Sequence, residues 1–261
     1  MDIRDIKEDV LYPGGKALDE MFRLQFILVD YYTKIEDLPE YPVEIHTKTG
    51  QNLIKDFTSR IIEEFGEGFE SYLLMLDMFH HGVDEVQMIP HLQNFNEEVS
   101  DALHFWLELL IFSGFTYDSV KAWFNTHPSG ALEHIFSTTK MYLEQELMGK
   151  RYPGRWVIKD HQLKDEFLRG GRLLSNDRKD QMRMMLWDIT YWFMIARNTL
   201  KNKPWKQTGM MTDINQYEQC IFKATEAMFK FFIFTGFTPE SLYVIYYKKN
   251  KVNQFRIHSK Y

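Results

Sequence analysis

Apolar residues recur at helical spacing over most of the 261 residues of this chain. The first such segment, 17–35, follows the turn "YPGG", and others continue almost to the C-terminus. We find no run in which apolar and polar residues alternate as they do in strands. Because 44% of the residues are hydrophobic, the chain can bury a large core. The sequence therefore predicts an all-α fold built as a helical bundle.

The same spacing predicts further helices and one linker. The helices are expected at 50–81, 94–114, 116–127, 129–149, 163–174, 178–202, 213–236 and 238–256, and the linker at 150–161. Asn94 or Asn96 is expected to cap the helix at 94–114.

The composition excludes several classes of function. A net charge of −6 argues against broad nucleic-acid binding. Cys220 is the only cysteine, so no internal disulfide can form, which suits a reducing cytosol. The charged start "MDIRDIKEDV" lacks the apolar core of a signal peptide. The sequence contains no run of about 18 apolar residues, so it predicts no membrane-spanning helix. We therefore expect a cytoplasmic protein that binds neither nucleic acid nor membrane.

Two segments of the chain repeat each other. Residues 101–120 and 223–242 share seven identities in 20 ungapped positions, including Gly-Phe-Thr. Two unrelated apolar helices that both end in Gly-Phe-Thr are the alternative. A duplication would give two helical repeats, 1–149 and 150–261, packed as a pseudo-dimer in one compact unit.

Four carboxylates occur in two matching pairs. Glu64 and Glu67 are three residues apart, so they share one helix face, and Glu98 and Asp101 repeat this spacing on the next long helix. Antiparallel packing of the two helices would bring all four together. Like charges in one place raise each other's pKa, and a divalent cation relieves the repulsion. Oxygen ligands select Mg²⁺ or Mn²⁺ over Zn²⁺, and Mg²⁺ commonly takes further ligands from phosphates.

A solvated acidic face is the alternative for these residues. Against it, Asp101 begins the most apolar stretch of the chain, "ALHFWLELLIF" at 102–112. A buried acid needs a partner or a metal ion. We therefore predict a metal site with phosphate chemistry.

The motifs E-E-x-x-E, at 63–67, and E-x-x-D, at 98–101, resemble those of the all-α nucleoside triphosphate pyrophosphatase superfamily. This superfamily includes MazG-type enzymes, dimeric dUTPases and tailed-phage dCTPase-dUTPases. "DALHFWLELLIFSGF" is similar to the family's D-x-x-H-F helix, and "MFRLQFILVDYY" to its L-Q motif. "YYKKNKVNQFR" is similar to its K-N-x-x-N-x-x-R motif near the C-terminus. The resemblance covers 18–115 and 187–256 in pieces.

The resemblance implies a set of site residues. The catalytic metal ligands would be Glu64, Glu67, Glu98 and Asp101, with Glu63 as an accessory acid. The substrate-binding residues would be Gln25 and His104 at the nucleoside and Lys249, Asn250, Asn253 and Arg256 at the phosphates and nucleoside. The implied reaction is attack of water on the α-phosphate, which gives a nucleoside monophosphate and pyrophosphate. Cationic side chains would stabilise the charge that develops on the phosphates.

The chain departs from the family pattern in places. Val29 stands where the family's L-Q-x-x-L-N motif has Asn, so this motif does not name the base. The segment between the acid pairs lacks the family's tryptophan-lysine element, which "NKPWK" at 202–206 resembles instead. After "NQFR" the chain ends in "IHSKY" instead of the family's Gln and Gly-Tyr.

The two repeats have lost complementary parts. The second has Cys220 and Lys223 where the first has Glu98 and Asp101, but only the second carries the basic tail. We expect one composite site per chain, with acids from the first repeat and a basic clamp from the second. A solvated basic tail that merely balances the acids is the alternative.

These motifs together predict a Mg²⁺-dependent pyrophosphatase that hydrolyses dUTP or a related pyrimidine deoxynucleotide. The same chemistry on dCTP, dTTP or a modified pyrimidine nucleotide is one alternative. A nucleotide- or protein-binding homologue without catalysis is another. A homodimer through aromatic-rich helices such as "ITYWFMIA" is left open.

Overall fold

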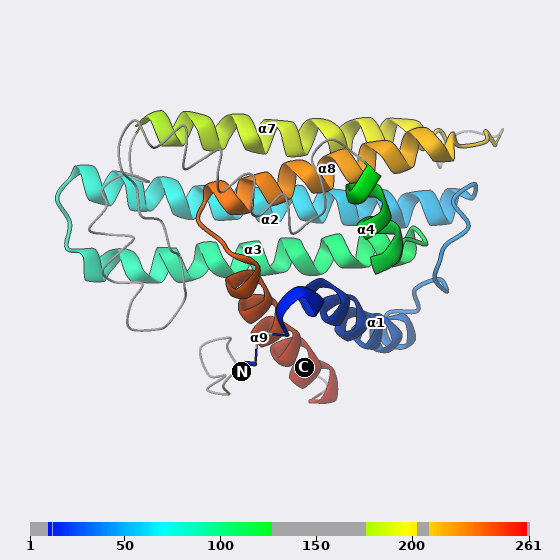
Figure 1. Cartoon of the computed structure of the whole chain (residues 1–261), viewed down its shortest axis with the longest axis horizontal. Coiled ribbons are helices and arrows are strands. Elements are labelled where there is room, and N and C mark those ends of the chain that lie inside the picture. Colours follow the sequence, from blue (N-terminus) through cyan, green and yellow to red (C-terminus); the bar gives the residue numbers. More distant parts are fainter. Residues whose placement is uncertain (1–9, 12, 127–175, 203–208, 260–261) are drawn as a thin grey trace.

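The computed structural model describes residues 10–259 except 12, 127–175 and 203–208. Within these ranges all regular elements are helical, which confirms the predicted all-α class (Figure 1). The elements are the 3₁₀ helix η2 Gly14–Lys16 and the α-helices α1 Ala17–Ile35, α2 Lys48–His80, α3 Glu85–Phe112, α4 Tyr117–Thr126, α7 Asn176–Thr199, α8 Ile214–Phe234 and α9 Pro239–His258.

Two long helical hairpins lie side by side and form the centre of the molecule. α2 and α3 run antiparallel and are joined by a tight turn at Gly82, whose φ is 67° (Figure 1). α7 and α8 form the second pair. α1 and α9 pack against each other and against α3. α4 lies at one end of the bundle, where Trp123 stacks on Phe222 of α8 with the ring centroids 5.2 Å apart.

The two hairpins share one apolar core. Phe65 of α2 packs against Phe231 and Phe232 of α8, with ring centroids 5.2 and 5.8 Å away. Trp106 of α3 is fully buried, and its indole nitrogen donates to Thr225 Oγ1 of α8 at 2.9 Å. Each large apolar side chain buried in this way stabilises the fold by about 1.5–3 kcal/mol. The interior therefore joins the first half of the chain to the second.

Hydrogen bonds also join the halves at the start of α2. The fully buried Gln51 donates to Thr212 Oγ1 at 2.8 Å and accepts from the backbone amide of Asn202 at 2.8 Å. The side chain of Asn202 in turn donates to the carbonyl of His46 at 2.6 Å. Asn202 is the first residue of "NKPWK", and the other four residues of that segment lie outside the described part of the chain.

The two Gly-Phe-Thr segments have the same backbone geometry. Gly114 follows α3 and Gly236 follows α8, with φ angles of 83° and 93°. After each glycine, the phenylalanine amide donates to the carbonyl five residues earlier at 2.8 Å. The next threonine amide donates to a serine hydroxyl three residues later, again at 2.8 Å. Such helix ends favour glycine because φ is positive. This likeness agrees with the sequence repeat, while the duplication itself stays a prediction.

One helix start was predicted wrongly. α3 begins nine residues before Asn94, with Asp84 as its N-cap, whose carboxylate accepts from the amide of Val86 at 2.8 Å. The helix runs through Pro90, which lacks the N–H that would bond to the preceding turn. Met88 is buried in the core, and this tertiary packing outweighs the loss of the hydrogen bond.

Other predictions fall on residues that the structure leaves undescribed. These are the helices at 129–149 and 163–174, the linker at 150–161 and the boundary between the two repeats at 149/150. Among the described helices, none is both long and apolar enough to cross a bilayer.

Candidate metal and nucleotide site

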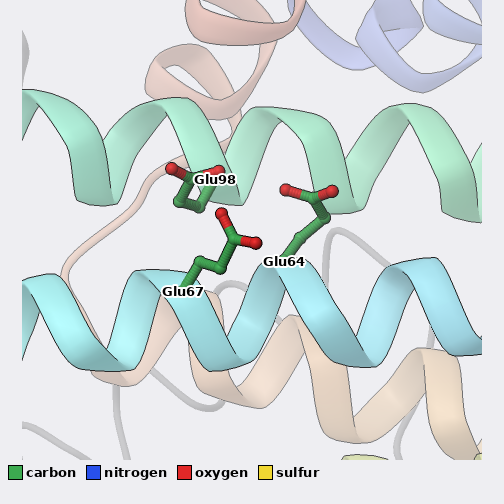
Figure 2. Close-up of side chains that lie close together, drawn as sticks. All are labelled: Glu64, Glu67 and Glu98. Carbon is green, nitrogen blue, oxygen red and sulfur yellow. The ribbon is translucent and has the colours of Figure 1, made fainter.

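Three glutamates meet between α2 and α3. The antiparallel hairpin sets Glu64 and Glu67 opposite Glu98, and Figure 2 shows the three carboxylates converging from the two helices. One oxygen of each lies within 4.8 Å of the others. Glu98 is 9% exposed, Glu64 is half-buried and Glu67 is exposed. The predicted i, i+3 pair on α2 therefore does meet an acid of α3.

The proximity of these acids disfavours their ionisation. Burial raises the pKa of the Glu64 carboxyl to about 8, with further contributions from its hydrogen bond to Glu98 and from the negative charges of Asp101, Glu98 and Glu67. Burial likewise raises the pKa of Glu98, against the opposing effect of its hydrogen bond with Glu64. Without a cation, the cluster retains a proton near neutral pH. A divalent cation at this position would replace that proton.

Asp101 lies one turn beyond Glu98 and pairs with α9. Lys249 Nζ lies 2.7 Å from Asp101 Oδ2 and 2.8 Å from Glu97 Oε1, and the lysine side chain is 6% exposed. Burial lowers the pKa of Lys249, but the two carboxylates outweigh this effect, so the net shift is upward and the amine stays protonated. The structure thus brings three of the four predicted metal ligands together and places the fourth beside them, held by the predicted phosphate-binding lysine. Glu63 is exposed on α2 and lies outside the group of three.

Gln25 and His104 are sealed in the interior. Gln25 is 0% and His104 is 3% exposed. His104 Nδ1 lies 2.8 Å from Gln25 Oε1, which also accepts from the hydroxyl of Tyr246 at 2.8 Å. The imidazole stacks on the Tyr246 ring at 4.4 Å, and burial lowers the pKa of His104 to about 3, so the ring is neutral. These two residues therefore lie in the interior beneath the candidate site and support it without reaching its surface.

Glu108 was not among the predicted site residues, but it belongs to the same hydrogen-bond network as Gln25 and His104. Gln25 Nε2 donates to Glu108 Oε1 at 2.9 Å. Glu108 is 9% exposed, and burial raises its pKa to about 8. Its position in the sequence could have revealed it, because Glu108 lies seven residues after Asp101 in an otherwise apolar run. Seven residues are two helical turns, so both acids lie on one face of α3.

The basic tail reaches the acids within one chain. Asn250 is buried and donates to Tyr246 Oη at 3.4 Å, while Asn253 is half-buried. Burial raises the pKa of Asp101, and the positive charges of Lys249 and of the exposed Arg256 oppose this shift. Together with the ion pair of Lys249, this places the C-terminal helix of the second half over the acidic hairpin of the first.

The matching face of the second hairpin has a different character. Cys220 is buried, and Lys223 Nζ lies 4.5 Å from the ring centroid of Trp192 in a cation–π contact. Glu226 pairs with Lys230 at 2.7 Å. Within the described residues, the group of three acids between α2 and α3 is the only cluster with metal-ligand spacing.

Comparisons with protein-family models, with curated proteins and with solved structures found no match for this chain. Any functional assignment therefore depends on the sequence motifs and on the geometry described above.

Proposed function

We propose that this chain is a Mg²⁺-dependent nucleoside triphosphate pyrophosphohydrolase of the all-α type, acting on dUTP or a related pyrimidine deoxynucleotide. The observation that carries the proposal is the convergence of three carboxylates within 4.8 Å between α2 and α3. Lys249 from the other half of the chain lies next to this cluster through Asp101.

The donor set fits a hard cation. Glu64, Glu67 and Glu98 offer only carboxylate oxygens, which suit Mg²⁺ or Mn²⁺. Asp101 lies one helical turn after Glu98 and would have to release Lys249 in order to join them. When bound, such an ion polarises phosphoryl oxygens and lowers the pKa of a coordinated water.

The residues of the chain supply the remaining functions. A glutamate of the cluster orients the attacking water and accepts its proton. Lys249 exchanges its carboxylate partners for phosphate oxygens, and Arg256, which has no ion pair within the described residues, provides a second cation. Both neutralise charge on the triphosphate and on the leaving pyrophosphate.

We further propose that the two halves arose by duplication and pack as a pseudo-dimer with one composite site. The equal geometry at Gly114 and Gly236 supports the duplication. The acidic cluster, single among the described residues, and the pairing of Lys249 of α9 with Asp101 beside it support the division of roles.

A pyrophosphate-release assay tests this function. The protein is incubated with Mg²⁺ and each of dUTP, dCTP, dTTP, dATP and dGTP, with Glu64→Gln in parallel. We expect release from a pyrimidine nucleotide that the substitution abolishes. Absence of release from all five would contradict the proposal, and nucleotide-dependent thermal stabilisation would then favour a binding protein without catalysis.

A further inference from the structure

Glu108 presents one unused oxygen. Its Oε1 accepts from Gln25, while Oε2 has no hydrogen-bond partner among the described residues and is not sealed from solvent. Glu108 lies two turns of α3 beyond Asp101, or about 10 Å along the helix at 1.5 Å per residue. This separation is of the order of that between the phosphates and the base of a nucleotide.

Glu108 has no ion pair among the described residues. Burial raises its pKa, and the charge of Arg60 of α2 opposes this, but that guanidinium donates to Asp56 at 2.9 Å and lies over the ring of Phe105. The negative charges of Glu36, just after α1, and of Asp101, on α3 itself, further disfavour a carboxylate here. A buried acid in such surroundings is held in its neutral form near pH 7. Because Oε1 is occupied as an acceptor, the hydrogen of the neutral acid belongs on Oε2.

Tyr32 of α1 also has an unused polar group and lies within electrostatic range of Glu108. The side chain is half-buried on α1, and its hydroxyl has no hydrogen-bond partner within the part of the chain that the structure describes. Burial raises its pKa to about 12, with contributions from Glu108 and Asp101 and an opposing effect of Arg256. Tyr32 is thus within electrostatic range of both the acidic face of α3 and the basic tail. Its ring offers a flat apolar surface at that place.

Gln25 connects these groups to the interior. It lies two turns before Tyr32 on α1, so the two share a helix face. Its side-chain amide is hydrogen-bonded to His104, Tyr246 and Glu108. These bonds fix the orientation of the Glu108 carboxyl. Since Gln25 and His104 are sealed, they act through Glu108 as positioning residues.

We propose that Tyr32 and Glu108 form the nucleobase subsite of the site described above. The Glu108 carboxyl donates its hydrogen to a C4 carbonyl, such as that of uracil, while the base packs on the Tyr32 ring. This inference depends on the proposed function for the position of the phosphates. Val29, buried and apolar, offers no competing donor in the motif where the family has Asn.

The test compares substitutions that keep or remove the donor. Glu108→Gln retains a donor on the outer atom, whereas Glu108→Ala removes it; Glu36→Gln and Tyr31→Leu are matched controls for Glu108 and for Tyr32→Leu. We measure kcat/KM for dUTP and dCTP between pH 6.5 and 9.5, and calorimetric binding of dUMP and of pyrophosphate with Mg²⁺. A lost hydrogen bond of about 1.4 kcal/mol corresponds to a tenfold change.

We expect Glu108→Ala and Tyr32→Leu to lower kcat/KM for dUTP at least tenfold without weakening pyrophosphate binding. The wild-type preference for dUTP over dCTP should decline above pH 8, as the Glu108 proton is lost, and Glu108→Gln should not show this decline. Equal losses on dUTP and dCTP in Glu108→Ala, weakened pyrophosphate binding, or equal pH profiles of wild type and Glu108→Gln would overturn the subsite.

Failure of the proposed function gives a different result. In that case the wild-type protein releases no pyrophosphate from any nucleotide. Binding of dUMP then tests the proposed subsite by itself. A lower affinity of Glu108→Ala than of the wild-type protein supports the subsite. No binding to either protein, or equal affinity of the two, overturns it.

Discussion

The hairpins α2–α3 and α7–α8 end alike but differ in the chemistry of their faces. Gly114 and Gly236 close α3 and α8 with positive φ and the same hydrogen bonds. Between α2 and α3, however, three glutamates converge, whereas α8 presents Cys220 and a lysine stacked on Trp192. The same type of helix pair is thus built with and without an acidic cluster.

This difference shows that the acids are not a requirement of the helix packing. A group of carboxylates raises the free energy of the folded state, because burial and like charge oppose ionisation. Among the described residues, the α7–α8 hairpin has no such group of carboxylates, whereas the α2–α3 hairpin has one. We infer that the acidic cluster is kept for binding or catalysis. The predictions that follow test this asymmetry, from the largest expected effect to the smallest.

The largest expected difference between substitutions in the two hairpins is in catalytic activity. Glu64→Gln should lower Mg²⁺-dependent pyrophosphate release by about 10³-fold, since it removes a charged ligand and a candidate base. Asp188→Asn, which changes an acid on α7, should leave the rate unchanged. Initial rates at saturating nucleotide give both values. Equal losses in the two variants would remove the asymmetry on which the account depends.

The ion pairs of the two halves should differ in stability. Lys249→Met leaves Asp101 and Glu97 unpaired next to the cluster, so the free energy of unfolding should fall by about 2 kcal/mol. Lys230→Met breaks an ion pair of α8 whose lysine side chain is 49% exposed, and should cost under about 0.5 kcal/mol. Urea denaturation measures both. The account of Lys249 is wrong if its substitution costs no more than that of Lys230.

The pH dependence of stability should be confined to the acidic hairpin. The folded-state pKa of Glu64, about 8, lies above its unfolded value of 4.5, so the folded protein retains a proton that the unfolded chain releases. Without metal, the contribution of Glu64 to stability should therefore fall as pH rises from about 5 to 8, by on the order of 1–2 kcal/mol after allowance for solvent screening. Glu64→Gln should remove this part of the decline.

Thermal unfolding in a chelator at pH 5 and pH 8 measures this effect. Glu108 and His104, whose lowered pKa acts in the opposite direction, contribute equally to wild type and to Glu64→Gln, so the difference between the two proteins isolates Glu64. Glu226→Gln on α8 is the matched control and should leave the decline intact. Added Mg²⁺ should stabilise the wild-type protein more at pH 8 than at pH 5, because protons compete with the ion at the lower pH. An identical pH profile in wild type and Glu64→Gln would contradict this assignment.

The smallest effects test what the hairpins share. Gly114→Ala and Gly236→Ala should each lower the free energy of unfolding by about 1 kcal/mol, since alanine is strained at positive φ. At Gly114 a Cβ would also lie 3.3 Å from Pro42 Cβ, a tight contact that adds to the loss. Gly66→Ala in the middle of α2, where a Cβ meets nothing within 4 Å, should instead stabilise by about 0.5–1 kcal/mol. A stabilising effect at either turn would show that the two ends are not equivalent.

Local patterns in the sequence predicted most of the described helices and the common face of Glu64 and Glu67. The helix at 17–35 was predicted at its observed bounds, because a turn precedes an unbroken amphipathic pattern. The i, i+3 spacing of Glu64 and Glu67 fixed their common face once α2 was helical. The start of α3 was missed because Asn94 and Asn96 suggested a later N-cap, while burial of Met88 extends the helix through Pro90.

Tertiary partners could not be predicted in the same way. The pairing of Lys249 with Asp101 joins residues 148 apart, and no local pattern encodes it. Gln25 and His104 were assigned to the nucleoside pocket by resemblance, but packing of α1 and α9 on α3 seals them. Glu108 went unnoticed because a single acid within an apolar run has no periodic partner in the sequence.

The most direct test of the composite site is a crystal structure with Mn²⁺ and a non-hydrolysable α,β-imido analogue of dUTP, with the metal located by anomalous scattering. The account predicts an anomalous peak between Glu64, Glu67 and Glu98, with the phosphates contacting Lys249 and Arg256 of the same chain. A metal bound elsewhere, or phosphates held by the C-terminal helix of a second copy, would contradict it.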